Sequence, residues 1–141
     1  MSTTTSAKTF NSIAMLALLL AAFLVTGNSF ANSVNQGSWV NKQKTIQGNW
    51  EVKQENGNTI VSFKNNFKTR GGPDLKVFLS KNDISNANGR NATNGSVLLS
   101  PLKSTNGSQE YVIPSNINVN DFASVLIHCE QFSVLWGGFN I

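Results

Sequence analysis

Apolar and polar residues alternate along several short stretches of this chain, a pattern with a period of two that is typical of β-strands. The clearest example surrounds Asn56-Gly57, a pair that suits a two-residue type I′ turn because both positions require a positive φ. With the turn placed there, Trp50 lies opposite Phe63 and Val52 lies opposite Val61. These apolar residues share one face, so the pattern predicts a half-buried hairpin.

A second Asn-Gly pair, Asn106-Gly107, predicts another hairpin by the same reasoning. Its register places Leu102 opposite Tyr111 and Lys103 opposite Glu110, which makes one apolar pair and one pair of opposite charge. Pro101 and Pro114 confine the ladder to the middle of this hairpin, because proline donates no ladder hydrogen bond. We therefore expect the two arms to be neighbouring strands of one sheet.

The C-terminal region is the most apolar part of the chain after its N-terminal segment, and it predicts a third hairpin from the stretches 125–129 and 132–136. A tip at Glu130-Gln131 places Cys129 opposite Phe132. Glu-Gln suits a primed turn poorly, so a longer loop or a β-bulge is the open alternative.

Both faces of this last hairpin carry apolar residues, with Leu126 and Leu135 on the face away from Cys129. Burial on both faces is typical of central strands. Earlier in the chain, 75–79 predicts a short strand, and the polar, asparagine-rich stretch 80–96 predicts a long surface loop. No helical periodicity of useful length occurs outside the N-terminal segment. The predicted fold class is therefore all-β, an antiparallel β-sandwich or a closed barrel built from successive hairpins.

The first thirty-one residues have the composition of a secretory signal peptide. Lys8 provides positive charge, Ile13–Val25 form an unbroken apolar run, and Ser29-Phe30-Ala31 has small residues at the −3 and −1 positions of a cleavage site. The alternative is a retained membrane anchor, but thirteen apolar residues are fewer than the roughly 20 that a spanning helix needs. We expect cleavage after Ala31, a secreted, periplasmic or cell-surface location, and no stable membrane span in the mature chain.

Removal of residues 1–31 leaves 110 of the 141 residues, which suits one domain with one core. We assign 32–43 to a polar linker with one anchoring aromatic residue, Trp39, and 44–141 to the β domain. This mature part carries ten basic and seven acidic residues, scattered rather than gathered into a basic run with interleaved aromatics. The pattern does not indicate nucleic-acid binding, and the mild positive charge favours solubility or an anionic partner.

Cys129 is the single cysteine of the chain, and His128 beside it is the single histidine. One cysteine excludes an intramolecular disulfide, so the thiol is buried, pairs between chains or reacts. Its alternation with Val125 and Ile127 favours a core position, whereas its place near a hairpin tip favours access. Two interpretations of Cys129 are therefore open: a reactive thiol or soft ligand, and a small core residue.

Neighbouring residues of a regular strand point to opposite faces, so His128 and Cys129 would share a site only at a bulge or turn. A solvent-facing or partly packed His128 is the simpler interpretation. One Cys and one His do not supply the donors of a Cys/His zinc site, and no Cys-x-x-Cys-His motif for covalent haem occurs. We expect no metal, the sequence identifies no cofactor, and no hydrolase motif surrounds His128.

Three motifs follow one another in the mature chain: Gly48-x-Trp50, Phe67-Lys68-Thr69-x-x-Gly72-Pro73-Asp74-Leu75-x-Val77-x-Leu79, and Val125-Leu126-Ile127-x-Cys129-x-x-Phe132-Ser133-Val134-x-x-Gly137. In combination they resemble the DM-thirteen domain, a small electron transfer domain also found beside DOMON domains. The resemblance covers about Lys44 to Ile141. It implies an all-β extracytoplasmic domain in which Cys129 and Asp74 occupy motif positions. The chain departs from the family at His128, where many members have an aromatic residue.

The resemblance implies a role in redox or electron transfer, with Cys129 as the candidate centre and Asp74 as a candidate binding residue. His128 is a further candidate binding residue beside Cys129, and it either adds a ligand or replaces the packing of the aromatic residue. The implied partner is a redox partner protein or a cell-surface component. Asp74 follows a Gly-Gly-Pro turn, so it either lines a site near Cys129 or caps the turn. The alternative function is a non-catalytic binding or adhesion module. Such a module would present loops 80–96 and 115–121 to a glycan, cell-surface or protein partner, with Cys129 buried.

Overall fold

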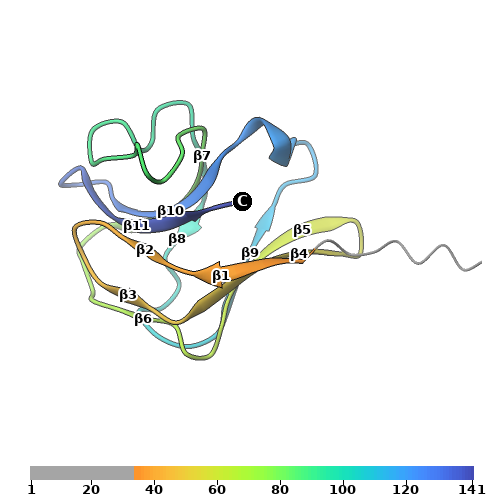
Figure 1. Ribbon diagram of the computed structural model, residues 1–141, viewed down its shortest axis with the longest axis horizontal. Helices are drawn as coiled ribbons and strands as arrows, with labels where there is room; N and C mark the ends of the chain where they lie inside the picture. Colours follow the sequence, from red (N-terminus) through yellow and green to blue (C-terminus); the bar gives the residue numbers. More distant parts are fainter. Residues whose placement is uncertain (1–33) are drawn as a thin grey trace, which may run out of the picture. The chain divides into compact units, whose positions relative to one another are not determined.

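Figure 1 presents the computed structural model of the chain, which describes residues 34–141. The expected signal peptide over residues 1–31 lies outside the described residues, as does the start of the expected linker. The described part forms eleven strands and one 3-10 helix, with these bounds: β1 Asn35–Ser38, β2 Val40–Asn41, β3 Ile46–Gln47, β4 Asn49–Glu55, β5 Asn58–Phe63, β6 Lys68–Thr69, β7 Leu75–Ser80, β8 Val97–Pro101, β9 Gln109–Ile113, η1 Val119–Asp121, β10 Ser124–Cys129 and β11 Val134–Asn140.

These strands form two larger sheets and one small one. The four-stranded sheet has the order β1-β4-β5-β9, the five-stranded sheet has the order β2-β11-β10-β7-β8, and β3 pairs with β6. Buried side chains of both larger sheets join in one hydrophobic core, so the two sheets form the layers seen in Figure 1. The all-β antiparallel prediction is confirmed, and the architecture is a sandwich of open sheets rather than a closed barrel.

The hairpin β4–β5 has the predicted turn and register. Asn56 and Gly57 both have a positive φ, of 50° and 80°. Trp50 pairs with Phe63 and Val52 pairs with Val61. Local turn chemistry and the alternation of apolar residues agree here, which explains why the sequence specified this hairpin correctly.

The hairpin predicted around Asn106-Gly107 is wrong. β8 pairs with β7 in the five-stranded sheet, whereas β9 pairs with β5 in the four-stranded sheet, with Tyr111 opposite Val61. The intervening residues cross from one layer to the other. The predicted ladder between these arms is absent. The backbone N–H of Lys103 instead donates a hydrogen bond of 3.0 Å to the side-chain hydroxyl of Tyr111. The fold therefore does not consist of successive hairpins throughout, because pairing between distant strands prevails at this position.

The C-terminal hairpin exists, but its predicted register is wrong. Cys129 pairs with Val134 rather than with Phe132, because the connection is a four-residue loop over 130–133. A β-bulge follows at Trp136, where the register shifts between Ile127 and His128. The longer loop and the bulge, which were the open alternatives, are both present.

β10 lies in the centre of the five-stranded sheet, and all six of its residues are buried. This confirms the predicted burial on both faces. On the outer face Leu126 and Leu135 pack with Phe78 against three residues of the polar loop over 81–96, namely Ile84, Ala87 and Ala92. The loop predicted to lie on the surface therefore also covers one face of the sheet with three of its side chains.

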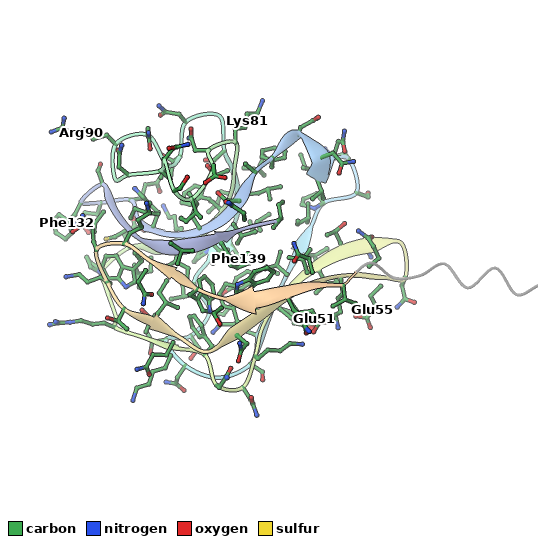
Figure 2. All side chains as sticks on the ribbon, in the orientation of Figure 1. Glu51, Glu55, Lys81, Arg90, Phe132 and Phe139 are labelled. Carbon is green, nitrogen blue, oxygen red and sulfur yellow. The ribbon has the colours of Figure 1, made fainter. Side chains whose placement is uncertain are left out.

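Residues 35–41 were expected in a linker but belong to the sheets, because β1 pairs with β4 and β2 pairs with β11. Trp39 between them is buried, as the expected anchoring role requires, and its ring contacts Phe63, Phe67 and Phe139. Phe139 also stacks on Trp50 with ring centroids 3.8 Å apart, and Figure 2 shows it between the two layers. The aromatic core thus fastens the N-terminal strands to the domain.

Candidate functional site

Cys129 is the last residue of β10 and is fully buried, with 0% of its surface exposed. It belongs to the main core on the inner face of the sheet, together with Val125 and Ile127. In the two neighbouring strands its register partners are Leu75 and Val134. The surroundings of the thiol are therefore apolar, and solvent does not reach it. This geometry is that of a small core residue.

His128 lies on the opposite, outer face of β10 and is 2% exposed. Its Nε2 lies 3.0 Å from the carbonyl oxygen of Gly89, in the loop that covers this face. The ring also meets Phe78 edge-on, with centroids 6.2 Å apart. The expectation of a solvent-facing or partly packed histidine is wrong, because the loop over 81–96 encloses the side chain. A carbonyl only accepts, so Nε2 carries the proton, and Nδ1 is buried without a hydrogen-bond partner.

The two neighbours do not form a joint site. The extra residue of the bulge is on β11, so β10 stays regular and keeps His128 and Cys129 on opposite faces. Within residues 34–141 no group of three or more His, Cys, Asp and Glu side chains could hold a metal ion. The residues around Cys129 therefore do not fit a metal centre.

Asp74 lies at the surface just before β7, and its side chain is 34% exposed. Its Oδ1 is 3.4 Å from the Nζ of Lys76, which also forms an ion pair with Glu130. The hydrogen bond to Glu130, followed by that to Asp74, raises the pKa of Lys76 above its ordinary value. The backbone carbonyl of Asp74 accepts a hydrogen bond of 3.1 Å from the N–H of Glu130. Asp74 is therefore close to the end of the cysteine-bearing strand, but its carboxylate faces the surface charges.

A pocket of about 330 Å³ lies beside Asp74, between the segments 71–75 and 101–105. Leu75 lines this pocket and is also the register partner of Cys129. Paired residues of an antiparallel ladder project from the same face of the sheet. Leu75 is therefore a neighbour of both the pocket and Cys129.

The two motif blocks that the sequence singled out, Gly72-Pro73-Asp74-Leu75 and Cys129-x-x-Phe132, thus meet at one end of the domain. In a comparison with protein-family models, the model described as "Electron transfer DM13" matches residues 38–141. The chain belongs to the electron transfer DM13 family. The predicted resemblance is confirmed, and the match includes all the strands from β2 to β11. Neither the curated proteins nor the solved structures gave a match.

Trp136 is a residue of this DM13 domain that sequence reasoning missed. It occupies the bulge of β11, is buried, and donates a hydrogen bond of 3.2 Å from Nε1 to the carbonyl of Arg70. A Cβ at Gly72 would lie 3.0 Å from the Trp136 ring and 3.3 Å from Leu75. Glycine at position 72 therefore allows the motif loop to approach the indole closely. The Gly-Gly-Pro sequence was the available signal for this close approach.

A second hollow of the DM13 domain, of about 500 Å³, involves the loop over 115–120. Its other walls come from β1, β4, β5 and the C-terminal Ile141, and its lining is mostly polar, with Lys53 as the charged residue. Of the two loops considered for a binding module, 115–121 thus borders a hollow, whereas 80–96 covers the outer face of the sheet. No helix within residues 34–141 has the length and apolarity needed to cross a membrane.

Proposed function

We propose that this electron transfer DM13 domain is exported and exchanges electrons with a partner protein outside the cytoplasm, with Cys129 as its redox centre. The observation that carries the proposal is the meeting of the two motif blocks. Leu75 pairs with Cys129, and the N–H of Glu130 donates to the carbonyl of Asp74 over 3.1 Å. The electron transfer description of the family then supplies the type of chemistry.

Burial of Cys129 restricts what its thiol could do. Disulfide exchange needs a second sulfur to attack the first, and this chain has a single, fully buried cysteine. Transfer of an electron to a nearby acceptor of sufficiently high potential does not require a second sulfur to reach the thiol, so the proposal assigns electron exchange to Cys129. Removal of one electron from the thiol sulfur, with the partner as acceptor, also releases the S–H proton. The proposal assigns this proton to solvent at the end of β10, because the carboxylates of Asp74 and Glu130 face the surface in ion pairs with Lys76 rather than the thiol.

Export is the second part of the proposal. The features that support it are Lys8, the apolar run Ile13–Val25 and the small residues of Ser29-Phe30-Ala31. They support a mature protein in the periplasm, in the medium or at the cell surface. Mass spectrometry of the protein recovered from outside the cytoplasm tests this directly. A mature N-terminus at Asn32 is expected, and an intact N-terminus in a membrane fraction would identify a retained anchor instead.

A non-catalytic binding or adhesion module is the second candidate function, and one observation favours it. Cys129 is packed like an ordinary core residue, and buried structural cysteines are typically inert. The hollow of about 500 Å³ bordered by the loop over 115–120 would then be the place to receive a glycan, cell-surface or protein partner.

Absorbance spectra of chemically oxidised and chemically reduced protein separate the two candidates. Electron transfer at Cys129 predicts a difference between the two spectra that Cys129→Ala lacks, with the near-ultraviolet circular dichroism of the variant unchanged. Cys129→Ser is the closer match in volume and serves as the control for packing. Identical oxidised and reduced spectra of the unaltered protein would reject the redox centre and favour the binding module.

A further inference from the structure

A groove of about 460 Å³ lies beside β3 and β6 and is lined by cationic and neutral polar residues. We call it the cationic groove, and its lining consists of Gln43, Lys44, Thr45, Gln47, Lys68, Thr69 and Arg70. Three of these seven side chains are cationic and none is acidic. Such a concentration of one sign of charge contrasts with the scattered charge of the sequence as a whole.

The cations of the groove are not neutralised within the part of the chain that the structure describes. All the ion pairs found there involve other lysines, Lys53, Lys64 and Lys76. Lys44, Lys68 and Arg70 therefore present uncompensated charge. A cluster of this kind raises the local concentration of an oppositely charged molecule and accelerates its association.

The backbone of the groove is held in place before anything binds. Ile46 pairs with Thr69, and the hydroxyl of Thr69 donates to the carbonyl of Thr45 over 3.0 Å. The N–H of Thr69 also donates to the carbonyl of Thr105 over 2.8 Å. Both walls are thus fixed to each other and to a neighbouring loop, which lowers the ordering cost of association.

We propose that the cationic groove is the docking surface for an acidic partner protein. Its three cations alternate with amide and hydroxyl side chains, which suits carboxylates and peptide groups together. Anionic membranes are typically bound by clusters of four to eight basic residues. Single-stranded nucleic acids need exposed aromatic side chains for stacking, and no aromatic residue lines this groove.

This inference rests on the proposed function, because the groove adjoins the candidate redox site. The carbonyl of Arg70 accepts the hydrogen bond of Trp136, and the loop at Gly72 lies against the Trp136 ring and Leu75. Leu75 in turn pairs with Cys129. A protein seated in the groove would therefore lie over the segment that leads to the thiol, as electron exchange requires.

Binding of dye-labelled poly-L-glutamate at low ionic strength tests the docking surface. The variant Lys44→Gln/Lys68→Gln/Arg70→Gln is compared with Lys81→Gln/Arg90→Gln/Lys103→Gln, which removes the same charge from exposed positions outside the groove. We expect the groove variant to bind about tenfold or more weakly and the control variant to stay close to the unaltered protein. Equal losses of affinity in the two variants would mean that net charge alone explains the binding, and this result would overturn the proposal.

Two further probes separate the alternative occupants and the proposed function. Heparin and vesicles containing phosphatidylserine represent a sulfated glycan and an anionic membrane. Groove-dependent binding of either probe without binding of poly-L-glutamate would overturn an acidic protein partner. The binding experiment does not depend on redox activity. Groove-dependent binding together with identical oxidised and reduced spectra would therefore reject Cys129 as the centre while the docking surface stands.

Discussion

Leu75 and Cys129 are register partners in the neighbouring strands β7 and β10, and Leu75 also lines the pocket beside Asp74. Leu75 thus adjoins both the pocket and the single thiol of the chain, which is fully buried. Access to Cys129 should consequently depend on the size of residue 75.

The first prediction concerns this access. In the unaltered native protein the thiol should not react with a chromogenic thiol reagent, and one thiol per chain should react after unfolding. Leu75→Ala should make the native thiol reactive, at a cost of about 2 to 5 kcal/mol in stability because a cavity forms. The rate of reagent release in native buffer measures the effect.

Leu126→Ala is the matched control, since Leu126 is a fully buried leucine of β10 on the face away from Cys129. It should lose a similar amount of stability and leave the thiol unreactive. Equal reactivity of the two variants would mean that general destabilisation, rather than an opening at Leu75, exposes Cys129.

The second prediction compares two glycines, one at which only the positive φ favours glycine and one at which a Cβ would also clash. Gly57 has a φ of 80° and open space where a Cβ would be, so Gly57→Ala should cost about 1 kcal/mol from backbone strain. Gly48 has a φ of 95°, and a Cβ there would lie 2.4 Å from the carbonyl oxygen of Asn66. Gly48→Ala should therefore cost clearly more than Gly57→Ala in urea unfolding. Equal losses would refute the close approach at Gly48.

The third prediction concerns Tyr111, the only tyrosine of the chain. Burial raises the pKa of Tyr111 to about 12, although the hydrogen bond from the N–H of Lys103 opposes the shift. Because the folded-state pKa lies above the unfolded value, this tyrosine stabilises the fold at lower pH. That contribution should be lost as the pH rises from about 10 through 12.

Ultraviolet absorbance of the phenolate follows this titration directly. Native protein should ionise with a midpoint near 12, and protein unfolded in urea should ionise near 10. A native midpoint at the unfolded value would mean that the hydroxyl is not buried as described. Tyr111→Phe provides the baseline, since it removes the phenolate signal.

The fourth prediction concerns the ion pair of Asp74 with Lys76. Asp74→Asn removes one of the two carboxylates that raise the pKa of Lys76, so this pKa should fall, although Glu130, the larger cause, still raises it. Asp121→Asn, at an exposed position in η1, is the control and should leave the pKa of Lys76 unaltered. An NMR titration of the Lys76 side chain measures the difference. The same pKa of Lys76 in both variants would refute the contact with Asp74.

Local signals in the sequence predicted the local parts of this fold. The turn at Asn56-Gly57 and its register followed from two glycine-compatible positions and alternating apolar residues. The same signals at Asn106-Gly107 failed, because a turn does not specify which sheet its arms join. Pairing of β9 with β5 depends on residues about fifty positions apart, which alternation in one segment cannot reveal.

The sequence likewise predicted some features of the candidate site and missed others. Alternation with Val125 and Ile127 correctly placed Cys129 on an inner face, and it separated the cysteine from His128. It did not reveal that a polar loop would enclose His128, because the loop contacts the ring through the backbone carbonyl of Gly89, which side-chain alternation does not report. Trp136 was missed because the bulge that positions it arises from the pairing of β10 with β11.

Protein-film voltammetry of the unaltered protein and of Cys129→Ala tests the central claim most directly. Electron transfer centred on Cys129 predicts a redox wave for the unaltered protein that is absent from the alanine variant, while both proteins unfold cooperatively. A wave of the same potential and size in Cys129→Ala would place the redox centre elsewhere. Absence of a wave from the unaltered protein would contradict the account and leave Cys129 as a residue of the core.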